Sequence, residues 1–120
     1  MDESENTLRS LAVHDEQVIR SVVAAGLDTP DVLGIDAKTY ALVRLAGMIC
    51  LDASIASYQS AVSLALAAGA TTSDIVDTLR SVAALVGCPR LVAAAPALAL
   101  ALGYDIDAAL EDYHEATHQP

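Results

Sequence analysis

The sequence predicts an all-α protein, and three observations support that prediction. Apolar residues recur at helical spacing along the chain, and no segment shows the strict alternation that is typical of a strand. Gly, Pro and capping residues divide the chain into pieces of helix length. The apolar content of 54% comes mostly from Ala, Leu and Val, with no Trp and no Phe. We therefore expect a single domain of about six short helices over residues 1–120.

The N-terminal region, residues 1–34, is expected to contain one helix and a loop. Residues 1–6 have the composition of a frayed acidic leader. The first helix is predicted from about Leu8 to Ala25, with Gly26 ending it. Residues 27–34 contain Pro and Gly and are expected to form a loop.

The next two helices are predicted from their caps. Asp36 is a natural N-cap for a helix over about 37–51. Asp52 or Ser54 is expected to cap the following helix, which reaches about Ala68.

A further pair of helices is delimited by Gly and Pro. The sequence from Thr71 to Asp74 has the form of a capping box, and Gly87 is expected to close the helix that it opens. Pro89 suits the first turn of the next helix, and Pro96 predicts a kink inside it. A last short helix is expected over about 107–117 in the C-terminal tail, residues 105–120.

Charge and composition limit the expected partners. Sixteen acidic residues oppose six scattered basic ones, which gives a net charge of −10 and argues against nucleic acid and membrane surfaces as partners. Two cysteines and an acidic start without a signal peptide predict a cytoplasmic protein. A core of small apolar residues buries little area per residue, so we expect self-association into a homo-oligomer.

Three motifs between residues 35 and 104 carry a resemblance to a known family. They are the helix start Ile35-Asp36-Ala37-Lys38-Thr39, the helix end Ala65-Leu66-Ala67-Ala68-Gly69-Ala70-Thr71, and the turn Val86-Gly87-Cys88-Pro89. In this order and spacing they resemble the carboxymuconolactone decarboxylase family, which includes the alkylhydroperoxidase D branch. The resemblance implies an all-α fold of about six helices that associates into homotrimers or homohexamers.

The resemblance also locates the positions of the family's chemistry. Its peroxidase branch carries a Cys-x-x-Cys pair and a His on the helix before Gly69, and a Glu on the preceding helix. Counting back along this chain, Ser54 and Ser57 stand at the cysteine positions, Ala61 at the His position and Ala41 at the Glu position. All four of the family's catalytic residues are thus replaced, and we assign no catalytic residue, no metal and no cofactor.

The predicted ligand-binding residues are Arg44, Ser54, Ser57 and Tyr58, which would bind a small anionic organic ligand. The two serines can instead serve as local caps of their helix. Arg44 is either a solvent-facing residue or an anchor for an anion.

Other reactive residues have simple structural explanations. Cys50 and Cys88 are expected to serve in packing rather than in redox chemistry. The pattern His114-Glu115-Ala116-Thr117-His118 matches a zinc motif, but it lies at the end of the chain without a third ligand, and we predict no zinc site there.

Three functions remain open at this point. The first is a divergent carboxymuconolactone decarboxylase-like protein, a lyase or isomerase-like enzyme that acts on a small organic acid or lactone. The second is an alkylhydroperoxidase-like or peroxiredoxin-like antioxidant protein. The third is a non-catalytic oligomeric binding or scaffold protein that has kept the fold and lost the reaction.

Overall fold

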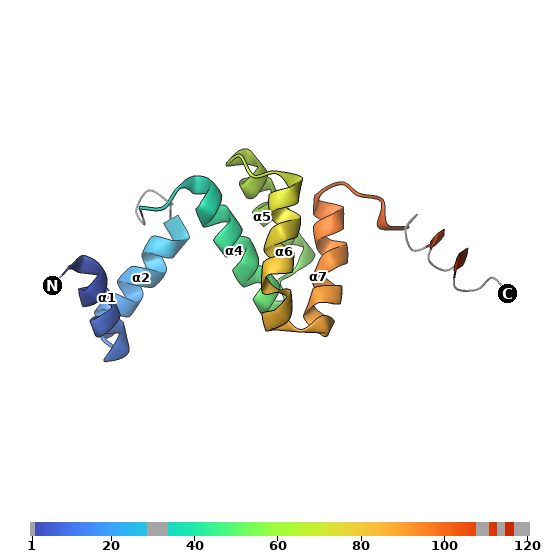
Figure 1. Cartoon of the computed structure of the whole chain (residues 1–120). Coiled ribbons are helices and arrows are strands. Elements are labelled where there is room, and N and C mark those ends of the chain that lie inside the picture. Colours follow the sequence, from blue (N-terminus) through green and yellow to red (C-terminus); the bar gives the residue numbers. More distant parts are fainter. Residues whose placement is uncertain (1, 29–33, 108–110, 113–114, 117–120) are drawn as a thin grey trace. The chain divides into compact units, whose positions relative to one another are not determined.

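The computed structural model describes residues 2–28, 34–107, 111–112 and 115–116, and within these ranges the secondary structure is helical, with no strand (Figure 1). This confirms the predicted all-α class. The helices of the described residues have the following bounds: α1 Glu3–Ala12, α2 Glu16–Asp28, α4 Ala37–Leu51, α5 Ile55–Ala67, α6 Thr72–Val86 and α7 Cys88–Ala101. The chain divides into two compact units, Met1–Asp36 and Ala37–Pro120. The division falls two residues after the predicted boundary between 34 and 35.

The first unit differs from its prediction, because two helices stand where one was expected. The backbone turns at His14, which has a φ of +59°. The Asp15 carboxylate then accepts hydrogen bonds from the backbone N–H groups of Gln17 and Val18, at 3.1 and 3.3 Å. Asp is a stronger residue at a helix N-cap than inside a helix. Asp15 therefore starts a new helix instead of continuing the first one.

The ends of these two helices also correct the prediction. The acidic start is not a frayed leader, since Asp2 caps α1 by accepting a hydrogen bond from the Glu5 backbone N–H at 2.7 Å. Helix α2 continues through Gly26 to Asp28. A glycine inside a helix costs only about 1 kcal/mol, which the rest of a helix can offset. Most of the predicted loop over 27–34 lies outside the described residues, and so does much of the helix predicted over 107–117.

Within the described part of the second unit, helices α4, α5, α6 and α7 pack on one another around a common core. Helix α4 contacts α5, α6 and α7, and α7 contacts α5 and α6; Figure 1 shows the four side by side. The largest fully buried side chains are Leu45, Ile49, Tyr58, Val62 and Ile75. Much of the remaining core is alanine, and such small side chains let the helices approach closely.

The start of α6 forms the predicted capping box. The Thr71 hydroxyl accepts a hydrogen bond from the Asp74 backbone N–H at 3.0 Å, and the Asp74 carboxylate accepts one from the Thr71 backbone N–H at 2.9 Å. The same carboxylate pairs with the Lys38 ammonium at 3.1 Å. The hydrogen bond from the Thr71 backbone, followed by the one from Lys38, lowers the pKa of Asp74. The cap thus links the start of α6 to the start of α4.

Gly87 joins α6 to α7 as predicted. Its φ of 83° and ψ of 166° lie in a region that is essentially restricted to glycine. Pro89 stands in the first turn of α7, and the helix continues through Pro96 to Ala101. Among the described helices, none has both the length and the apolar character needed to cross a bilayer.

Candidate functional site

Ser54 and Ser57 lie together at the start of α5. The Ser54 hydroxyl accepts a hydrogen bond from the Ser57 backbone N–H at 3.2 Å, and it donates to the Ser57 hydroxyl at 3.0 Å. Ser54 is therefore the N-cap of α5, one of the two caps that the sequence predicted. These contacts are those of a local helix cap. The sequence had left two roles open for the serines, ligand binding and capping, and the observed contacts are those of capping.

Tyr58 points into the core instead of lining an open wall. Its side chain is only 2% exposed, and its hydroxyl donates a hydrogen bond to the backbone carbonyl of Met48 at 3.4 Å. Burial, with smaller contributions from the charges of Asp52 and Cys50, raises the pKa of Tyr58 above its ordinary value. Near neutral pH the phenol stays protonated and acts as a hydrogen-bond donor, which makes it a poor general base.

The raised pKa of Tyr58 has a measurable consequence at alkaline pH. The ordinary pKa is 10.0, and the folded value is higher, so between the two the unfolded state has lost a proton that the folded state keeps. The free energy of unfolding should therefore fall as the pH rises above about 10. We expect a shallower fall for Tyr58→Phe, measured by urea denaturation between pH 9 and 11.

A matched control for this prediction is Tyr104→Phe, because Tyr104 is exposed. Its stability should depend on pH as that of the wild type does. If both substitutions change the alkaline dependence equally, burial of Tyr58 is not its cause.

Ala41 and Ala61, which the resemblance predicts at the positions of Glu and His, are part of the hydrophobic core. Ala41 is 1% exposed and Ala61 is 5% exposed, and both belong to the core cluster with Leu45 and Val62. Neither carries a group that can transfer a proton. Among the described residues, moreover, no charged side chain is buried. The surroundings of Ala41 and Ala61 are therefore those of a packed interior.

Arg44 is separated from the two serines along α4. Its guanidinium lies 5.4 Å from the centroid of the Tyr40 ring and donates a hydrogen bond to the Tyr40 hydroxyl at 3.3 Å. Leu51, where the turn toward the serines begins, lies seven positions after Arg44, which corresponds to about 10 Å of helix rise. The half-buried Arg44 is thus held along its own helix, one turn from Tyr40. Its role as an anion anchor stays a prediction.

The two cysteines are free thiols in different settings, with Cys50 half-buried near the end of α4 and Cys88 exposed at the start of α7. The Arg90 guanidinium donates a hydrogen bond to the backbone carbonyl of Cys50 and so links these two helix ends. Sequence reasoning missed this contact, because the two residues lie 40 positions apart. Within the described ranges, no three His, Cys, Asp or Glu side chains are grouped as metal ligands would be. The His114–His118 pattern includes positions outside the described residues.

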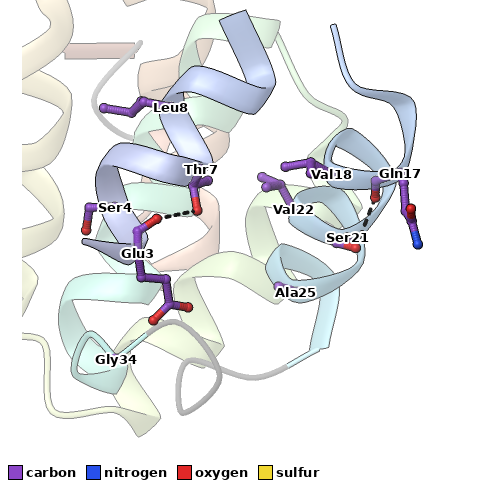
Figure 2. A pocket seen from close by; sticks show the side chains of 10 residues that line it. All are labelled: Glu3, Ser4, Thr7, Leu8, Gln17, Val18, Ser21, Val22, Ala25 and Gly34. Carbon is purple, nitrogen blue, oxygen red and sulfur yellow. Dashed lines mark hydrogen bonds between the residues drawn. The ribbon is translucent and has the colours of Figure 1, made fainter. Parts of the chain in front are cut away.

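The first unit holds a cleft that the sequence did not predict. It has a volume of about 1080 Å³, and Figure 2 shows Val18 and Val22 pointing from α2 toward α1. The hydroxyl of Thr7 donates to the backbone carbonyl of Glu3 at 2.9 Å, and that of Ser21 donates to the carbonyl of Gln17 at 3.0 Å. The ten lining residues are Glu3, Ser4, Thr7, Leu8, Gln17, Val18, Ser21, Val22, Ala25 and Gly34.

A second and smaller cavity, of about 230 Å³, lies between α6 and α7 in the other unit. Its lining residues are apolar or aromatic: Ile75, Val76, Leu79, Ala95, Leu98, Ala99, Leu102 and Tyr104.

Chemically, the predicted site residues therefore offer a helix cap, a neutral buried phenol and a guanidinium beside an aromatic ring. Such groups can bind a ligand, but they do not form a pair of acid and base. No family model, no curated protein and no solved structure matches this chain.

Proposed function

We propose that this protein is a non-catalytic binding or scaffold protein that assembles with copies of itself, on a helical fold of the carboxymuconolactone decarboxylase type. One observation carries the proposal. The positions that would hold the family's Glu and His are Ala41 and Ala61, and both are packed inside the core. A working enzyme would need titratable groups at an accessible surface there.

The two enzymatic alternatives find less support in the same geometry. A peroxidase of this family needs two thiols and a proton relay, whereas Ser54 and Ser57 form a helix cap. A lyase or isomerase needs a group whose pKa is tuned for proton transfer. Tyr58 has a shifted pKa, but the shift is away from neutrality and its hydroxyl already donates to Met48.

Self-association is supported by the apolar surface of the helices. Monomeric proteins seldom expose large contiguous apolar areas, and here each described helix carries at least one exposed large apolar side chain. The large apolar side chains of the described residues that are more than half exposed are Leu8, Val13, Val23, Val43, Leu51, Ile55, Leu85, Val92 and Tyr104. The proposed assembly is a homotrimer or homohexamer in the cytoplasm.

The first test of this proposal is the mass of the protein in solution. We expect light scattering at low micromolar concentration to give a multiple of the 12.4 kDa chain mass. A mass of one chain at that concentration would contradict the proposed assembly.

The second test is activity. Peroxide consumption with a dithiol reductant should be negligible for the wild type, and so should conversion of carboxymuconolactone. Cys50→Ser and Cys88→Ser serve as controls for the peroxidase assay. Robust turnover that either substitution abolishes would establish a catalytic thiol and overturn the non-catalytic proposal.

A further inference from the structure

Helices α1 and α2 have no core of their own among the residues whose burial is described. No residue of α1 is buried, and no described side chain of α2 is buried either. The helices are 10 and 13 residues long, and isolated helices of this length are only marginally stable in water. Their stability must come from burial of their apolar residues against another surface.

The cleft between these helices indicates the shape of that surface. Its hydroxyl groups at Thr7 and Ser21 are already bonded to the backbone of their own helices, and Leu8, Val18 and Val22 contribute apolar side chains. A groove between two antiparallel helices is the kind of site that accepts the apolar face of a third helix. A helix that is apolar on one side and poor in acidic residues therefore fits this cleft.

The charge distribution indicates that such a helix can come from the core of a second copy of this chain. Residues 1–36 carry eight acidic and two basic side chains, whereas residues 37–104 carry three acidic and four basic ones. The net charge of −10 is thus confined to the ends of the chain. The acidic first unit of one copy is therefore complementary in charge to the slightly basic helical core of another copy. Two first units would repel each other, because both are acidic.

The outer face of α7 in the core has the character that this cleft requires. The exposed residues of that face follow the helical repeat and include no acidic group: Pro89, Val92, Ala93, Pro96 and Leu100. Arg90 is the only charged residue of α7, and it is basic. Helix α7 has 14 residues, about 21 Å, which matches the length of about 20 Å for α2.

We infer that the cleft between α1 and α2 of one copy binds the outer face of α7 of a second copy. This inference rests on the self-association in the proposed function and assigns the surfaces that produce it. The two surfaces differ, so the contact is heterologous. Heterologous contacts close into rings when the rotation between copies permits, as in a trimer.

The experiment compares Val22→Asp with Val23→Asp in the full chain. Both residues are exposed neighbours on α2, but only Val22 lines the cleft. We expect Val22→Asp to weaken assembly by about a hundredfold or more in sedimentation or light scattering, because an unpaired carboxylate inside an interface is strongly destabilising. Val23→Asp should assemble as the wild type does.

A second variant tests the opposite surface. Val92 is 68% exposed, so Val92→Asp leaves the fold of the chain intact and should also abolish assembly. Each variant keeps one intact surface. An equimolar mixture of Val22→Asp and Val92→Asp should therefore form dimers that neither forms alone, with the helical content by circular dichroism unchanged.

The outcomes separate the inference from the proposed function. A wild-type protein that is monomeric would overturn both. If the wild type is an oligomer and the Val22→Asp variant still assembles by itself, the inference alone is overturned. A mixture of the two variants that forms no dimer would also overturn the inference alone. Loss of thermal stability in Val22→Asp with assembly unchanged would also overturn it, because the cleft would then be covered within one chain.

Discussion

Replacing Leu45 with Ala is expected to lower the free energy of unfolding by about 2–5 kcal/mol. Leu45 lies in the middle of α4 and is 0% exposed. It belongs to the core cluster, so the substitution removes buried methyl groups and leaves a cavity. In a core built largely from alanine, few large side chains are available to fill such a cavity. The measurement is chemical denaturation followed by circular dichroism.

The matched control is Leu51→Ala, the same substitution in the same helix. Leu51 is 81% exposed, so its replacement should change the free energy of unfolding by no more than about 0.5 kcal/mol. Equal losses for the two variants would contradict the core assigned to this bundle. A loss for Leu51→Ala that disappears on dilution would instead assign Leu51 to a contact between copies.

Two glycine substitutions are expected to act in opposite directions. Gly87→Ala should destabilise the fold by about 1–3 kcal/mol, because the backbone conformation of Gly87, φ 83° and ψ 166°, is strained for any residue with a Cβ atom. Gly47→Ala should stabilise it by up to about 1 kcal/mol, since alanine is the better helix former and its methyl group would meet open space in α4.

Thermal denaturation of both variants beside the wild type tests this pair. The melting temperature should fall for Gly87→Ala and rise for Gly47→Ala. If Gly47→Ala lowers the melting temperature of the assembled protein but not that of the dissociated monomer, another copy packs closely against that face of α4. A Gly87→Ala protein as stable as the wild type would mean that the α6–α7 turn can adopt a different backbone conformation.

The core helices could be predicted because their ends are marked in the sequence itself. Ser54, the Thr71–Asp74 box, Gly87 and Pro89 act on residues within a few positions, and the structure has each in its predicted role. The first unit was predicted less well because Asp15 competes between two local roles, inside a helix and at its N-cap.

The candidate site depends on tertiary packing and could not be predicted in the same way. Spacing places Ser54, Ser57 and Ala61 on one side of a helix, but it does not show whether that side meets solvent or another helix. In the structure Ala61 is covered and the serines form a cap. The cleft between α1 and α2 had no sequence signal at all, since it arises only after the chain reverses at His14.

The hydrogen bond from Arg90 to the Cys50 carbonyl has a consequence for local unfolding. The last carbonyl groups of a helix have no partner within it and carry partial negative charge, so a guanidinium there satisfies the end of α4. Since Arg90 belongs to the first turn of α7, fraying of that turn also releases the end of α4. These two segments, forty residues apart in sequence, should therefore open as one cooperative unit in amide hydrogen exchange. Their backbone amides would share a single opening free energy, although α5 and α6 lie between them in the chain.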